Sequence, residues 1–163
     1  MRIFGIICCL LTILPIWAYE DIEDSTFYAD VGTLLLINPT GGVGYRLQHN
    51  HHGLDIAARL SLGFTLQAKL SGMYVYYCNP QDSSQYYVGV GGAGLYLRAL
   101  RLFGGSKSSF GLCSELLFGK EFHTDSFQRR FLQIQIGFPT YYFNTSIDGA
   151  FIPMPTITYG FMF

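Results

Sequence analysis

Apolar and polar residues alternate at every second position through most of this chain. The longest run places apolar or small side chains at the even positions Phe64, Leu66, Ala68, Leu70, Gly72, Tyr74 and Tyr76. Successive side chains of a β-strand point to opposite faces, so a period of two predicts strands with one apolar and one polar face. After Ala18 no segment shows a helical apolar stripe or an apolar stretch long enough to cross a bilayer as a helix. The pattern therefore predicts an all-β protein.

Clusters of turn-forming residues divide the alternating segments from one another. Asn, Pro, Asp and Gly gather at 38–42, 79–82, 104–107 and 148–149. Residues 141–147 also have an extended pattern and would change the strand count by one. The sequence predicts eight strands, near 31–38, 42–48, 53–61, 64–77, 86–98, 110–121, 128–138 and 155–163.

The N-terminus has the features of a secretory signal peptide. Arg2 supplies a positive charge, residues 3–14 are apolar, and Ala18 is the small residue expected before a cleavage site. The apolar run is shorter than the roughly 20 residues that a membrane-spanning helix needs, which makes a retained anchor helix the weaker alternative. We expect a signal peptide at 1–18 and a single exported domain at 19–163.

The composition is that of a membrane protein. Half of the residues (50%) are hydrophobic and only 13% are charged, whereas soluble domains carry about 25% charged residues. Ten basic residues are balanced by eleven acidic ones, which argues against a nucleic-acid-binding protein. In a membrane barrel, alternating strands present apolar side chains to lipid and polar ones to the lumen. The alternative is a secreted lipocalin-like ligand-binding barrel. Such proteins usually show G-x-W near the mature N-terminus, but here no tryptophan would remain after cleavage.

The segment 155–163 alternates strictly, with Ile157, Tyr159, Phe161 and Phe163 on one face. The ends of soluble chains are normally frayed and wet, so such an apolar end is unusual for them. The segment resembles the terminal strand of bacterial outer-membrane β-barrels, in which the outer-membrane assembly machinery reads the final Phe and the preceding alternate apolar residues. The resemblance implies that Tyr159, Phe161 and Phe163 form an assembly signal, with that machinery and outer-membrane lipid as partners.

The mature chain as a whole resembles the small eight-stranded outer-membrane barrels, the class of OmpX and the OmpA membrane domain. The resemblance implies a closed antiparallel up-and-down transmembrane β-barrel of about eight strands in the bacterial outer membrane, with both termini in the periplasm. Side chains fill the lumen of so small a barrel. We therefore predict a structural or surface-interaction role through loops near 99–109 and 139–154, and not a general porin. Residues 44–48, 52–55 and 86–91 also resemble small uncharacterised outer-membrane proteins of chlamydia-like bacteria, a likeness that implies no activity.

Charged and aromatic residues can be assigned to faces of such a barrel. A charge that faces lipid at the midplane costs roughly 2–4 kcal/mol, whereas opposite charges in a narrow lumen can pair. The residues assigned to the lumen on this ground are Arg46, Asp55, Arg59, Lys69, Arg98, Glu115 and Glu121. Tyrosines near the predicted strand ends are expected in interfacial girdles, because a phenol has an apolar body and a polar tip. They are Tyr74, Tyr76, Tyr77, Tyr86, Tyr87, Tyr141, Tyr142 and Tyr159.

The histidine cluster at His49, His51 and His52 is the best candidate for chemistry. Several imidazoles in one turn could hold zinc or copper. A polar turn in which Asn50 and Gly53 supply the bend is the favoured alternative. We therefore predict no metal and no cofactor.

Two further sequence patterns resemble functional motifs but lack a feature that each function needs. Residues 89–94 fit G-x-G-x-x-G, but the extended pattern continues after them, whereas dinucleotide binding needs a helix there. His123 and Ser126 resemble the His and Ser pair of outer-membrane lipid A hydrolases. Those enzymes place the serine two residues after the histidine, and here it is three residues away. We predict no enzymatic activity, with a lipid-modifying outer-membrane enzyme as the remaining alternative.

Overall fold

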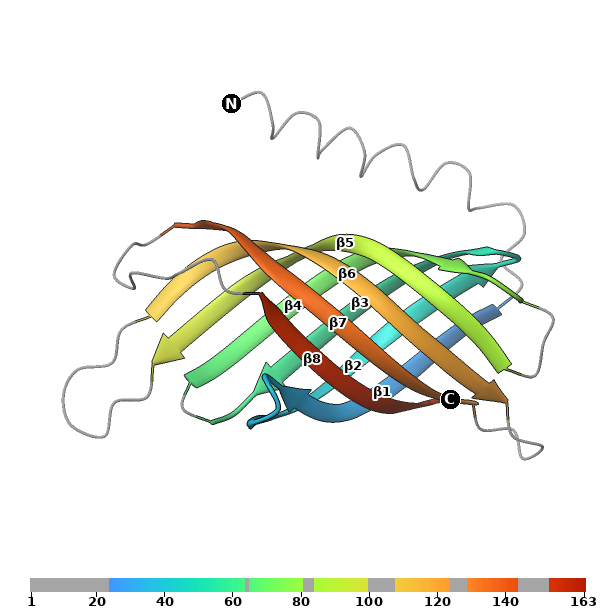
Figure 1. Cartoon of the computed structure of the whole chain (residues 1–163), viewed down its shortest axis with the longest axis horizontal. Coiled ribbons are helices and arrows are strands. Elements are labelled where there is room, and N and C mark those ends of the chain that lie inside the picture. Colours follow the sequence, from blue (N-terminus) through green and yellow to red (C-terminus); the bar gives the residue numbers. More distant parts are fainter. Residues whose placement is uncertain (1–23, 64, 81–83, 100–107, 124–128, 144–152) are drawn as a thin grey trace, which may run out of the picture.

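Eight antiparallel strands form a closed barrel in which each strand pairs with its neighbours in the chain and β1 pairs with β8 (Figure 1). The computed structural model describes residues 24–63, 65–80, 84–99, 108–123, 129–143 and 153–163. The strands are β1 (Asp24–Leu34), β2 (Asn38–His49), β3 (His52–Ser61), β4 (Thr65–Tyr77), β5 (Ser84–Ala99), β6 (Ser108–His123), β7 (Arg129–Tyr142) and β8 (Met154–Met162). The predicted fold class is confirmed. None of the described residues belongs to a helix long and apolar enough to cross a membrane.

The two rims of the barrel differ in what they carry. Tyr28 of β1 pairs with Met162 of β8, so the start of β1 and the end of β8 lie at the same rim (Figure 1). This rim, which we call the terminal rim, also carries the connections β2–β3, β4–β5 and β6–β7. The opposite rim, the loop rim, carries the two longest connections between strands, which follow Ala99 and Tyr142. The predicted signal peptide lies outside the described residues.

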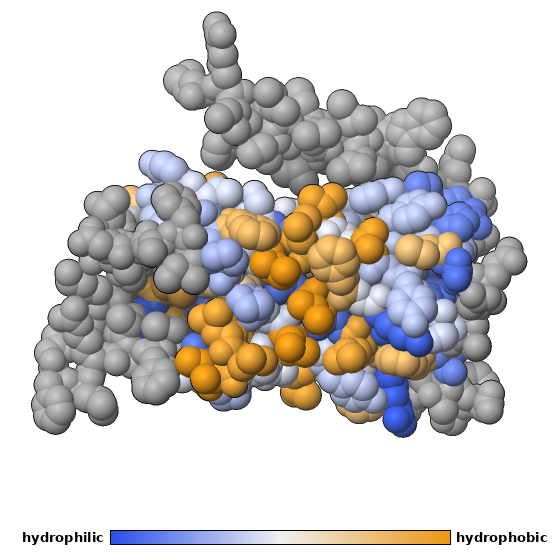
Figure 2. All heavy atoms as spheres, viewed as in Figure 1, coloured by the Kyte–Doolittle hydropathy of each residue, from blue (hydrophilic) through white to orange (hydrophobic). Residues whose placement is uncertain are grey.

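The polarity of the barrel wall is the reverse of that in a soluble β-protein. Apolar side chains on the outer face are widely exposed, including Leu60 at 56%, Leu70 at 63% and Val90 at 56%. Figure 2 shows such residues gathered over the middle of the wall, with hydrophilic side chains toward the terminal rim at the right. Charged and amide side chains such as Arg46 and Gln135 are instead buried in the lumen. The strands therefore direct their apolar faces outward.

The first two strands differ from the expectation, whereas the other six begin and end close to the predicted positions. The sequence predicts strands near 31–38 and 42–48 separated by a turn at 38–42. The structure instead places the turn between Leu34 and Asn38, where Leu35 and Leu36 adopt φ angles of 53° and 62°. Two successive positive φ angles match the right-handed twist of the adjoining strands, as in hairpin turns that usually contain Asn or Gly. Leucines at these positions gave no turn signal.

Two glycines of β2 lie beneath side chains of the lumen: Gly42, which belongs to the expected turn, and Gly44, which the sequence already places in a strand. A Cβ atom on Gly42 would lie 2.5 Å from Cγ of Arg59, and one on Gly44 would lie 2.2 Å from Cζ of Tyr28. Pro39 stands near the start of β2, where a strand tolerates the loss of one N–H donor. These glycines serve packing rather than a turn.

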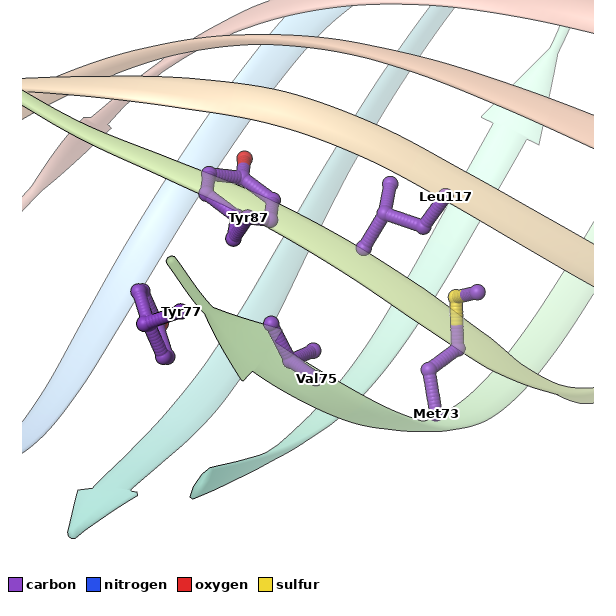
Figure 3. Packing of buried hydrophobic residues seen from close by; sticks show 5 residues of the cluster. All are labelled: Met73, Val75, Tyr77, Tyr87 and Leu117. Atoms are coloured by element: carbon purple, nitrogen blue, oxygen red, sulfur yellow. The ribbon is translucent and has the colours of Figure 1, made fainter. Parts of the chain in front are cut away.

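A cluster of apolar side chains fills part of the lumen between β4, β5 and β6. It contains Met73, Val75 and Tyr77 from β4, Tyr87 from β5 and Leu117 from β6 (Figure 3). The exposed fractions of Tyr77 and Tyr87 are 0% and 1%, so their assignment to an interfacial girdle is wrong. Each follows directly on a tyrosine of the outer face, and neighbouring residues of a strand must point to opposite sides.

Three aromatic rings in the lumen each lie over a glycine of the adjacent strand. The register pairs are Tyr28 with Gly44, Tyr87 with Gly119, and Phe131 with Gly160. A Cβ atom on any of the three glycines would lie 2.2 Å from the Cζ atom of its ring. Pairing a cross-strand aromatic residue with a glycine covers the bare backbone and leaves room for the ring inside a narrow barrel. We call these the glycine–ring pairs.

Candidate functional site

Arg46 is the centre of a buried charge network in the lumen near the terminal rim. It lies on β2 directly opposite Asp55 of β3, to which it donates from Nε at 2.7 Å and from Nη2. Nη1 donates to Glu121 of β6 at 2.6 Å. Nη2 also donates to Gln133 of β7 at 3.3 Å. Acceptors from three strands therefore surround one guanidinium, and Arg46 is only 3% exposed.

Aromatic side chains enclose this guanidinium and satisfy its acceptors. The carbon Cζ of Arg46 lies 4.7 Å from the ring centre of Tyr87 and 5.4 Å from those of Tyr28 and Phe131. Tyr28 donates its hydroxyl to Asp55 at 2.8 Å. Two further hydroxyls donate to the network, that of Tyr77 to Glu121 at 3.2 Å and that of Tyr87 to Gln133 at 3.0 Å. We call this assembly the lumen plug: Tyr28, Arg46, Asp55, Tyr77, Tyr87, Glu121, Phe131 and Gln133.

A second layer of charges continues from the plug toward the loop rim. Arg59 of β3 forms an ion pair with Asp30 of β1 at 2.7 Å and donates to Gln135 of β7 at 2.8 Å. Lys69 of β4 forms an ion pair with Glu115 of β6 at 2.8 Å. Gln135 joins the two pairs, because its Nε2 atom also donates to Glu115 at 2.6 Å. The layer links five strands of the barrel, β1, β3, β4, β6 and β7, through side chains alone.

Most of the charges assigned to the lumen from the sequence are placed there. These are Arg46, Asp55, Arg59, Lys69, Glu115 and Glu121. Arg98 departs from that expectation: it is exposed and points to the outer face of β5, beside the lumen-facing Leu97. It lies near the loop rim, where it pairs with Ser108 of β6. A cation on the outer face costs only about 0–1 kcal/mol near the interface, so alternation and not charge decides its direction.

The histidine turn does not gather its imidazoles around a common point. Nδ1 of His51 lies 2.8 Å from the carbonyl oxygen of Tyr77, and Nδ1 of His52 contacts the hydroxyl of Tyr74. Nε2 of His49 contacts the amide of Asn50 at 3.3 Å. Within the described ranges, no three His, Cys, Asp or Glu side chains are grouped so as to hold a metal ion. His51 and His52 instead hold the β2–β3 turn against β4, and His49 contacts a residue of the turn itself.

The C-terminal aromatic residues lie on the outer face at the terminal rim. Tyr159 and Phe161 are each 37% exposed and pack with their ring centres 5.3 Å apart. Phe163 is 75% exposed, and its backbone N–H donates to the carbonyl of Phe27 at 2.8 Å. His123 is the last residue of β6, while Ser126, considered with it as an enzymatic pair, lies outside the described residues.

Sequence reasoning missed several members of the lumen network. Gln133 and Gln135 alternate with apolar residues of β7, and this pattern alone identifies them as lumen-facing. Tyr28 and Asp30 lie before the first predicted strand, so no face was assigned to them. Alternation within the doublets Tyr76–Tyr77 and Tyr86–Tyr87 also places Tyr77 and Tyr87 in the lumen, because Tyr76 and Tyr86 face outward.

Comparison with known proteins identifies the fold. No protein-family model matches the chain, and no curated protein matches it either. Among solved structures, the N-terminal β-barrel domain of Pseudomonas aeruginosa OprF matches with a TM-score of 0.65 at 11% identity, covering 85% of this chain and 96% of that one. Neisserial surface protein A (NspA) matches with a TM-score of 0.66 at 8% identity, covering 85% and 94%. The chain thus has the fold of small outer-membrane barrels, while the likeness to proteins of chlamydia-like bacteria finds no support.

Proposed function

We propose that this chain is an integral outer-membrane β-barrel with a structural or surface-interaction role. The observation that carries the proposal is the reversed polarity of the wall, with ion pairs in the lumen and large apolar side chains exposed outside. A lipocalin-like protein would need the opposite arrangement, because its outer face is in water. The fold shared with two outer-membrane barrels supports the same location.

The lumen plug supports a role other than that of a general porin. Tyr28, Arg46, Tyr87 and Phe131 occupy the lumen near the terminal rim with exposed fractions of 0–3%. Side chains just fill the interior of an eight-stranded barrel, so an aqueous channel would require the plug to open. The plug supports a closed scaffold that presents its loops.

The connections at the loop rim supply the surfaces for interaction in this proposal. Bacterial barrels keep short turns on the periplasmic side and longer loops outside the cell. The connections after Ala99 and Tyr142 are the longest between strands and share one rim. The proposal includes no catalytic activity and no nucleic-acid partner.

Membrane fractionation and gel mobility test the proposal. We expect the protein in the outer-membrane fraction, with faster migration before heating than after it, because a closed barrel resists detergent until it is boiled. Liposomes that contain the folded protein should not swell in isotonic sugar solutions. Recovery from the soluble periplasm contradicts membrane insertion, and swelling at the rate of a general porin contradicts the closed scaffold.

The outer-membrane assembly machinery is a partner in this proposal, and Phe163 is the residue that tests it. In cells, Phe163→Ala should reduce the amount of folded barrel several-fold, whereas the same variant should refold in detergent like the wild type. Phe143→Ala is the matched control, because Phe143 is also an exposed aromatic residue (61%) but follows β7 at the loop rim. Equal assembly of the two variants contradicts a signal at Phe163.

A further inference from the structure

The outer face, over the residues that the structure describes, carries charge of one sign. The acidic side chains whose surroundings the structure describes are Asp30, Asp55, Glu115 and Glu121, and all four point into the lumen. Three basic side chains, Arg98, Lys120 and Arg130, lie on the outer face. Lys120 and Arg130 lie near the terminal rim, and Arg98 lies near the loop rim. The described outer face is therefore electrostatically complementary to an anionic ligand.

Lys120 and Arg130 lie close together within a row of aromatic rings. Phe122 of β6 pairs directly with Arg130 of β7, and Lys120 is the next residue of β6 on the same face. The Cα atoms of such diagonal neighbours on paired strands are about 7–8 Å apart. Nζ of Lys120 lies 4.6 Å from the ring centre of Tyr86 and 5.1 Å from that of Phe122. On the other side, Cζ of Arg130 lies 5.7 Å from the ring centre of Phe161. We call these five residues the cation belt.

The belt has the chemistry of a phosphate site at the edge of a bilayer. Long basic side chains lay their methylene stems on apolar surface and hold the charged group at the headgroup level, where Tyr residues also gather. The planar guanidinium of Arg130 suits a phosphate, whose oxygens accept two parallel N–H bonds.

We propose that Lys120 and Arg130 together bind the phosphate of one anionic glycerophospholipid in the leaflet at the terminal rim. The lipid's acyl chains lie along the apolar outer face of β6 and β7, over residues such as Phe118 and Leu132, which are 50% and 46% exposed. This inference rests on the proposed membrane location. If both termini are periplasmic, the lipid belongs to the periplasmic leaflet.

Native mass spectrometry of the refolded barrel in detergent, with added phosphatidylglycerol, tests the site. We expect one retained phosphatidylglycerol per barrel, bound at least about tenfold more tightly than phosphatidylcholine. The double variant Lys120→Gln/Arg130→Gln should lose that preference, and Lys120→Arg should keep it. Arg98→Gln is the matched control, because it removes one outer-face cation at the opposite rim.

The outcomes separate this inference from the proposed function. Equal binding of the two lipids by the wild type overturns the site, as does a preference that survives in the double variant. Loss of the preference in Arg98→Gln alone would move the site to the loop rim and contradict the assignment to Lys120 and Arg130. A protein that forms no heat-modifiable barrel overturns the proposed function instead. Gel mobility before and after heating checks the fold of each variant.

Discussion

Replacing Arg46 with methionine is expected to destabilise the folded barrel by about 3–5 kcal/mol. The change leaves the carboxyl groups of Asp55 and Glu121 in the lumen without their cation, and both residues are 1–3% exposed. Removing one partner of a buried ion pair is costly because the other charge stays buried and uncompensated. It also removes the cation that lies against the rings of Tyr28, Tyr87 and Phe131.

A urea titration of the barrel in lipid vesicles, with the folded fraction monitored by gel mobility, measures this loss of stability. The triple variant Arg46→Met/Asp55→Asn/Glu121→Gln should recover much of it, because neutral partners of similar size replace all three charges. Arg98→Met is the matched control: this exposed arginine should change the free energy of unfolding by no more than about 0.5 kcal/mol. If the Arg46 and Arg98 variants lose equal stability, the network does not stabilise the barrel.

Replacing Gly119 with alanine is expected to cost about 1–3 kcal/mol, although it adds a single methyl group. That methyl would lie 2.2 Å from Cζ of Tyr87, a ring that is 1% exposed and enclosed by the plug. The ring cannot yield without breaking its hydrogen bond to Gln133 and its contact with Arg46. Overpacking a filled interior forces side chains off their preferred rotamers.

Gly94→Ala is the matched control for this experiment. Gly94 also lies within a strand, but a Cβ atom placed on it meets nothing within 4 Å. Replacing a strand glycine by alanine removes conformational freedom from the unfolded chain, so stability should stay unchanged or rise by up to about 1 kcal/mol. The same urea titration measures both variants. Equal effects at the two glycines would contradict the role of the glycine–ring pair.

The fold class could be predicted from the sequence because alternation is a local property. Six of the eight strands follow directly from runs in which apolar residues occupy every second position, as in β4. The first two strands could not be placed because residues 38–42 have the composition of a turn, although they form the start of β2. Gly42 makes room for the side chain of Arg59 on β3, and no local signal distinguishes that role from a turn.

The lumen network could be predicted only in part. Alternation indicates which charged side chains face inward, but the partners of each depend on how the closed barrel staggers its strands. Arg46 and Glu121 are far apart in the sequence and lie on strands that do not pair, so nothing local joins them. Arg98 shows that alternation outweighs charge: its position in β5 directs the side chain outward, although its charge favours the lumen.

The position of Arg46 also constrains the order in which the barrel can fold. Its hydrogen-bond partners come from β3, β6 and β7, and the rings and hydroxyls around them come from β1, β4, β5 and β7. In a sheet that is still open, Arg46 can pair with Asp55 across the β2–β3 hairpin, but it cannot reach Glu121 and Gln133 on β6 and β7. The contacts of Arg46 with β6 and β7 therefore form only when the barrel closes. Sheets in which only some strands have paired are therefore short-lived, and folding of the barrel comes closer to an all-or-none transition.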